Sequence, residues 1–101
     1  MEERSYKFNK YEMIINIICT YKGISKSQLG NIIKDKECKY LLLLLLENYK
    51  CMDLQQMKVD LKISSNRSIR YNVKKAEERF FINKSFREKY FELEEIANQI
   101  I

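Results

Sequence analysis

Apolar residues recur at steps of three and four along the first third of the chain, which is the spacing of one buried helical face. The segment from Lys10 to Tyr21 is therefore predicted to be a helix, and its core-facing residues are Met13, Ile14, Ile17, Ile18 and Tyr21. Gly23 is the expected stop of this helix. Ser25 and Gln28 fit a capping box that opens a second, shorter helix ending near 34–36. The apolar set of that second helix is Ile24, Leu29, Ile32 and Ile33.

Six consecutive leucines occupy positions 41–46, within the segment DKECKYLLLLLLENYK that begins at Asp35. A helix that is apolar on every side must be surrounded by protein, so we predict the central core helix here. A β-strand is the alternative for a short apolar run. Leucine favours helix, however, and β-branched residues are missing from the flanks, which makes the helix the preferred interpretation.

Two further helices, separated by a short turn, are predicted over residues 53–79. Asp53 and Gln56 form a D-x-x-Q cap for the first of them, whose apolar stripe is Leu54, Met57 and Leu61. The sequence KISSN at 62–66 then ends this helix and caps the next. The second helix is predicted from Asn66 to Arg79, with a buried side made of Ile69, Val73, Ala76 and Phe80.

The pattern changes at residues 80–93, FFINKSFREKYFEL, to aromatic and β-branched residues around a charged centre. We expect a two-stranded β-hairpin here, with its tip near 85–89. Its aromatic residues are expected to pack on the helical core rather than to stack on bases; they are Phe80, Phe81, Phe86, Tyr90 and Phe91. A short terminal helix over 94–101 follows. Its apolar face has little core left to fill, so a second copy of the chain is its expected contact; that face is Leu93, Ile96, Ala97 and Ile100.

The order of these elements predicts a mainly α fold, a winged helix-turn-helix that forms one domain over residues 1–101. An N-terminal extension helix lies within 1–24, the helix-turn-helix at 53–79, the β-hairpin wing at 80–93 and the short terminal helix at 94–101. A length of 101 residues, 46% apolar and without proline, suits one mostly helical domain. Placing the helix-turn-helix at 25–48 instead is rejected, because a groove-facing helix cannot carry six leucines.

The residue types exclude most catalytic chemistry. Histidine is absent, and no glycine-rich phosphate loop or Ser-His-Asp set is present. Cys19, Cys38 and Cys51 are odd in number and lack C-x-x-C spacing, so they are interpreted as core thiols rather than as a disulfide or zinc framework. We therefore expect no enzyme, no cofactor and no metal. The N-terminus does not have the pattern of a signal peptide, and the longest apolar run has seven residues, so we expect a cytoplasmic protein without a membrane span.

The net charge is concentrated in one stretch of the chain. Residues 66–90 contain eight basic and three acidic side chains, so their net charge of +5 equals that of the whole chain. In a winged helix-turn-helix this stretch forms the recognition helix and the wing, which contact duplex DNA. The alternative is a solvated basic face without a partner.

The basic stretch divides into two predicted sets of DNA contacts. Candidates for reading bases lie in the first turns of the recognition helix and are Asn66, Arg67, Ser68, Arg70 and Tyr71. Candidates for sequence-independent phosphate contact are Lys74, Lys75, Lys84, Arg87 and Lys89. For Tyr71, contact with DNA and simple solvent exposure are both open.

The segment DKECKYLLLLLLEN at 35–48, together with the predicted helix-turn-helix, wing and terminal helix, resembles the TubR family. These are small centromere-binding proteins of plasmid and phage partition systems that use a tubulin-like GTPase, TubZ. The resemblance covers about residues 24–101. It implies a cytoplasmic homodimer that binds repeated centromere sites in double-stranded DNA cooperatively, represses its own operon and presents the DNA to TubZ filaments.

Two other functions are compatible with the same residues. One is a winged-helix transcription repressor that has no filament partner. The other is a protein-interaction module whose basic face binds an acidic protein. Both leave the chain without catalytic chemistry.

Overall fold

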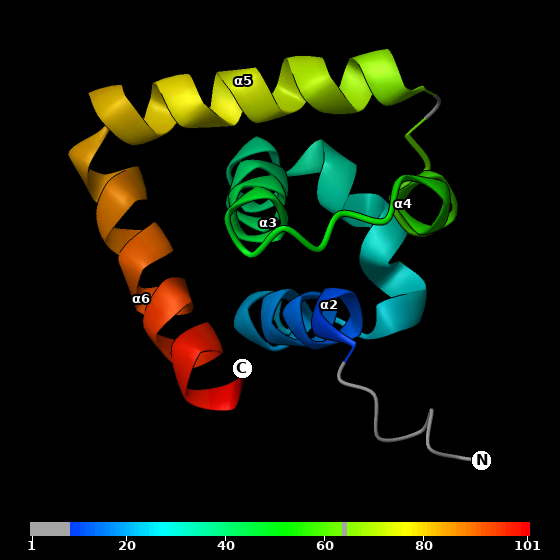
Figure 1. The fold of residues 1–101 in the computed structure, drawn as a ribbon, viewed down its shortest axis with the longest axis horizontal. Helices are drawn as coiled ribbons and strands as arrows, with labels where there is room; N and C mark the ends of the chain where they lie inside the picture. The colour runs from blue at the N-terminus through cyan, green and yellow to red at the C-terminus, as the bar shows by residue number, and fades with distance from the viewer. Residues whose placement is uncertain (1–8, 64) are drawn as a thin grey trace.

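The computed structural model describes residues 9–63 and 65–101, apart from the side chain of Ile33. Within this part, the chain forms α2 (Lys10–Lys22), the 3₁₀ helix η1 (Lys26–Lys34), α3 (Lys36–Asn48), α4 (Leu54–Asp60), α5 (Asn66–Ile82) and α6 (Lys84–Ile100). Figure 1 shows α3 at the centre, with α5 across one side, α2 on the opposite side and α6 closing one flank. The fold is mainly α, as predicted.

The leucine run forms the centre of the core. Residues 41–46 are all buried, and none of these side chains is more than 4% exposed. Asp35 starts α3, because its carboxylate accepts a hydrogen bond from the backbone N–H of Cys38 at 3.1 Å. The prediction of a central core helix is confirmed.

The predicted signals before α3 are also confirmed. Gly23 ends α2 in the left-handed conformation, with a φ of 74°, and its N–H reaches the carbonyls of Cys19 and Thr20. The side-chain oxygen of Gln28 accepts a hydrogen bond from the backbone N–H of Ser25 at 2.9 Å. The helix that this cap opens is 3₁₀ rather than α. The first eight residues of the predicted N-terminal extension lie outside the described residues.

Helix, turn and helix follow in the predicted order. The carboxylate of Asp53 accepts from the backbone N–H of Gln56 at 3.1 Å and opens α4. The hydroxyl of Ser65 accepts from the backbone N–H of Ser68 at 3.1 Å and opens α5. Ser64, the other serine of the predicted turn, lies outside the described residues.

The predicted β-hairpin wing at 80–93 is wrong. Strands are absent from the part of the chain that the structure describes, and these residues continue α5 to Ile82 and then form the first half of α6. Asn83 makes the corner between the two helices. It follows the last residue of α5, and its side chain accepts a hydrogen bond from the backbone N–H of Phe86 at 2.9 Å, which caps α6.

A second contact closes this corner. The guanidinium of Arg87 donates to the carbonyl oxygens of Phe80 and Phe81, at 2.8 and 3.3 Å. These carbonyls belong to the last turn of α5 and have no partner within that helix. Arg87 thus stabilises a helix end rather than the tip of a wing.

The apolar side of α6 is longer than the predicted terminal helix at 94–101. Phe86, Tyr90, Leu93 and Ala97, spaced four, three and four residues apart, are each at most 2% exposed. This helical spacing decides the structure despite the aromatic residues that favour a strand. Leu93 and Ala97 therefore belong to the core of the same chain, and the predicted leftover face is reduced to half-exposed Ile96 and Ile100.

All three cysteines were predicted to be core thiols, and two of them lie in the core. Cys19 and Cys38 are buried, and Cys51 is half-buried. Burial raises the pKa of the Cys38 thiol to about 11, so this side chain stays protonated at neutral pH. It therefore acts as a small apolar residue.

Candidate nucleic-acid interface

Helix α5 presents one side to the core and the opposite side to solvent. Ile69, Val73 and Ala76 are buried, and the helix packs mainly on α3. At 1.5 Å per residue its 17 residues extend about 26 Å. Figure 1 shows α5 lying across the outside of the bundle, so its polar side faces away from the protein. The core contact fixes which side chains are available to a partner.

The predicted base-reading set lies on the first two turns of α5. Asn66, Arg67, Arg70 and Tyr71 are exposed. Ser68 is only half-exposed, and its backbone carbonyl accepts a hydrogen bond from the side-chain amide of Asn72 at 2.8 Å. Long donors are therefore grouped at the exposed start of the helix, as contact with base edges requires.

Two of the five predicted phosphate contacts lie beside that set. Lys74 is exposed one turn after Arg70. Lys75 is half-buried; its ammonium lies 3.6 Å from the carboxylate of Glu78 and 5.5 Å from the centre of the Tyr71 ring. Tyr71 itself is 61% exposed. It therefore joins the polar side of α5 rather than the core.

The other three predicted phosphate contacts are not brought into this surface, because they belong to α6 and not to a wing. Lys84 lies 4.0 Å from Glu88, one turn further along the same helix. Arg87 is used at the end of α5. Lys89 lies 2.6 Å from the carboxylate of Glu37, at the start of α3. The basic stretch read from the sequence is thus split between two surfaces.

The ion pair between Lys89 and Glu37 predicts that Lys89 on α6 and Lys74 on α5 differ in their effect on DNA binding. If the exposed side of α5 binds DNA, as the sequence predicts, replacing Lys89 by glutamine is expected to leave the salt dependence of that binding unchanged, because the Lys89 ammonium is already paired with Glu37. Replacing Lys74 by glutamine is expected to lower the slope of log K against log salt by about 0.9, the value for one lost phosphate contact. Fluorescence anisotropy at several salt concentrations measures both slopes. Equal reductions of the slope in the two variants would show that Lys89 belongs with Lys74 among the predicted phosphate contacts.

Sequence reasoning missed the basic residues on the side of α3 that faces α5. Lys36 and Lys39, three residues apart, share one face of α3 and lie beside Lys75 and Arg79 of α5. Asp35 and Glu37 flank Lys36 in the sequence, so the net charge summed over this segment shows no excess of basic residues. Their actual partners, Lys22 and Lys89, are 13 and 52 residues away, so no local pattern reveals them.

Residues 9–63 and 65–101 contain no group of three or more histidine, cysteine, aspartate or glutamate side chains that could hold a metal ion. In that same part of the chain, no helix combines the length and apolar character needed to cross a membrane.

Comparison with known proteins adds no relative. No family model, no curated protein and no solved structure matches this chain.

Proposed function

We propose that this protein binds duplex DNA sequence-specifically by placing the first half of α5 in the major groove. The observation that carries this proposal is the grouping of exposed Asn66, Arg67, Arg70 and Lys74 on one side of a helix whose other side is packed on α3. A helix anchored in this way is about as wide as the major groove, which measures about 12 Å. The preceding α4 and turn supply the arrangement in which such helices contact DNA.

The chemistry of the exposed side chains supports a division of roles. The guanidinium groups of Arg67 and Arg70 can each pair with the O6 and N7 atoms of guanine. Asn66 can pair with adenine or donate to a phosphate. Lys74 is a point charge one turn later and suits a phosphate. Base reading is thus assigned to the first two turns of α5, and backbone contact to the turn that follows.

This proposal rests on α5 and not on the family resemblance. The resemblance implied a winged fold, and residues 80–82 and 84–93 are helical. DNA contact by α6 is accordingly left out of the proposal.

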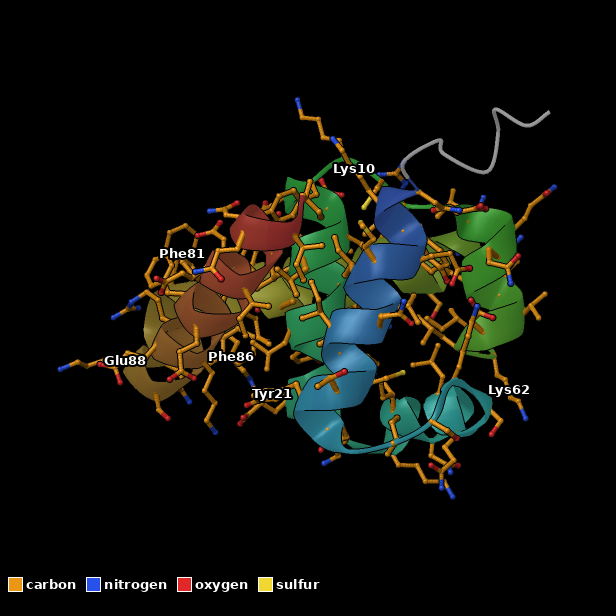
Figure 2. The ribbon with its side chains drawn as sticks, turned by 90° about the horizontal axis from the view of Figure 1, so that it is seen from below. Lys10, Tyr21, Lys62, Phe81, Phe86 and Glu88 are labelled. Carbon is orange, nitrogen blue, oxygen red and sulfur yellow. The ribbon has the colours of Figure 1, made fainter. Side chains whose placement is uncertain are left out.

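The proposal includes a homodimer, which would let two copies read two half-sites. We place its contact at a hollow of about 350 Å³ that α2 and α6 line together. Both helices are seen from this side of the bundle in Figure 2. Its walls are almost entirely apolar and include Met13, Ile17, Tyr21, Leu93, Ile96 and Ile100. Ile96 and Ile100 are the part of the predicted dimer face that the core leaves half-exposed.

Replacing Ile96 and Ile100 together by aspartate is expected to convert a dimer into a monomer, because two carboxylates would lose their hydration on association. Sedimentation velocity measures the change. Phe91→Asp is the matched control: Phe91 is half-exposed on another side of α6 and should leave the dimer intact. Dissociation by Phe91→Asp alone would contradict this placement of the interface.

A role in plasmid or phage segregation remains a prediction from the resemblance alone. It requires the DNA-bound protein to sediment with filaments of a tubulin-like GTPase encoded nearby, and only when DNA is present. DNA binding without such sedimentation would favour a transcription repressor.

The proposed DNA binding is tested by electrophoretic mobility shift with fragments that tile the DNA on both sides of the protein's own gene. We expect one or more fragments to bind with a dissociation constant of about 10⁻⁸ M or below at physiological salt. Random duplexes should bind at least about a thousand times more weakly. Equal affinity for all fragments and for random DNA would contradict sequence-specific binding and favour either an acidic protein partner or no partner for the basic side of α5.

A further inference from the structure

A hollow of about 520 Å³ lies between α3 and α5, on the flank of the proposed DNA-reading side. We call it the α3–α5 hollow. Helix α3 contributes Lys36, Lys39 and Tyr40 to its lining, and the contributions of α5 include Tyr71, Lys75 and Arg79. The fold thus brings basic residues about 40 positions apart in the sequence together in one surface.

The charges of the hollow are not balanced locally. Four basic side chains line it, against one carboxylate, that of Glu78, which lies 3.6 Å from Lys75. Among residues 9–63 and 65–101, no carboxylate oxygen lies within 4.0 Å of the charged nitrogens of Lys36, Lys39 or Arg79. Three cations therefore face a shared space without an acidic partner from the described chain.

The two acids that flank Lys36 are engaged elsewhere. Asp35 caps α3 and pairs with the ammonium of Lys22. The carboxylate of Glu37 pairs with the ammonium of Lys89 at 2.6 Å. Both pairs hold their acids away from the hollow, which leaves the positive charge of Lys36 and Lys39 available to an external anion.

The ring of Tyr40 holds two of the cations in place. The guanidinium carbon of Arg79 lies 5.2 Å from the ring centre, and the ammonium of Lys39 lies 5.4 Å from it. Partial burial, and secondarily the charge of Lys36, lower the pKa of Lys39. An anion bound in the hollow would offset both effects by stabilising the charged ammonium.

We propose that the α3–α5 hollow binds backbone phosphates of duplex DNA through Lys36, Lys39 and Arg79. The hollow adjoins the exposed side of α5, since Tyr71 and Lys75 belong to both. A helix that fills the major groove brings its flanks against the phosphates along the groove edges, where cations contribute affinity without reading bases. This inference rests on the proposed DNA binding and moves the sequence-independent contact from the predicted wing to α3.

The test is the double variant Lys36→Gln and Lys39→Gln, assayed by fluorescence anisotropy against a cognate and a random duplex at several salt concentrations. The slope of log K against log salt is expected to fall by about 1 to 2 for both duplexes, because about 0.9 is lost for each phosphate contact. The affinities for the two duplexes should fall by the same factor. Lys36→Arg with Lys39→Arg keeps the charge and is expected to keep the slope close to that of the original protein.

A matched control variant removes two positive charges from a part of the surface outside the hollow. Lys10 begins α2 and Lys50 lies shortly after the last residue of α3, and both side chains are exposed. Neither lysine lines the hollow, which lies at the start of α3, and Figure 2 shows Lys10 near the other end of that helix. The double variant Lys10→Gln and Lys50→Gln is expected to change the slope by less than half as much. The single variant Lys39→Gln, with an expected slope change of about 0.9, carries the test if the Lys36 and Lys39 double variant loses helicity by circular dichroism.

The outcomes separate this inference from the proposed function. If the original protein binds DNA and the Lys36 and Lys39 double variant keeps the same salt slope, phosphate binding in the α3–α5 hollow is contradicted and the proposed function is not. A loss confined to the cognate duplex would also contradict phosphate binding there, because that result would indicate base reading. Failure of the original protein to bind any duplex would contradict both phosphate binding in the hollow and the proposed function.

Discussion

Replacing Arg67 and Arg70 by alanine is expected to remove most of the protein's preference for its own DNA site. Each guanidinium paired with a guanine contributes about 1–3 kcal/mol of discrimination, so the double variant should lose about 2–6 kcal/mol, or at least about thirtyfold in preference. Alanine is the best helix former and both positions are exposed, so α5 should remain folded. Parallel anisotropy titrations of a cognate and a shuffled duplex measure the preference directly.

The control for this prediction removes two positive charges from the same helix without touching its first turns. Lys74→Gln with Lys75→Gln is expected to weaken binding to the cognate and shuffled duplexes by the same factor, because lysines placed against phosphates do not distinguish bases. The division of α5 into base-reading and phosphate-binding residues would be wrong if the arginine variant, like the lysine variant, lowered the affinities for the cognate and the shuffled duplex by the same factor.

Replacing Leu43 by alanine is expected to cost about 3 kcal/mol of unfolding free energy, which is within the range for buried leucines. Leu43 is fully buried in α3, the helix against which both α2 and α5 pack. The substitution removes apolar contacts and leaves a cavity that the surrounding helices can fill only in part. Urea unfolding followed by circular dichroism measures the change.

Val59→Ala is the matched control for the core substitution. Val59 lies on α4 and is 69% exposed, so shortening its side chain should change the unfolding free energy by no more than about 0.5 kcal/mol. A cost for Leu43→Ala as small as that of the control would show that α3 is not the centre of the core.

Local signals in the sequence were sufficient for the elements up to the middle of α5. Gly23 ends α2, Asp53 opens α4 and Ser65 opens α5, in each case through a contact between residues close in sequence. The leucine run required only that a helix apolar on every side be surrounded. Such features depend on the spacing and type of neighbouring residues, which a sequence displays directly.

The wing was mispredicted because intrinsic preference and periodicity disagreed over residues 80–93. Phenylalanine and tyrosine favour strands, but Phe86, Tyr90 and Leu93 are spaced for one side of a helix. The deciding residue is Asn83, which falls within the predicted hairpin at 80–93 and instead caps α6. Recognising it as a cap, with helix-favouring lysine, arginine and glutamate after it, would have favoured the correct structure.

The candidate site was predictable only where it lies on a single helix. Arg67 and Arg70 are where the sequence placed them, on the exposed side of α5. Lys89 was assigned to DNA and pairs with Glu37, while Lys36 was not assigned and lines the α3–α5 hollow. Whether a lysine is available to a ligand depends on which acids the fold brings to it, and those acids can come from distant parts of the chain.

The most direct test of the central claim, that α5 and not α6 contacts DNA, is an NMR titration of the backbone amides with duplex DNA. We expect the chemical-shift changes to concentrate in residues 66–75 of α5 and around 36–39 of α3, with α6 largely unaffected. Changes confined to α6, or an absence of changes along α5 when the duplex is bound, would contradict the proposed interface.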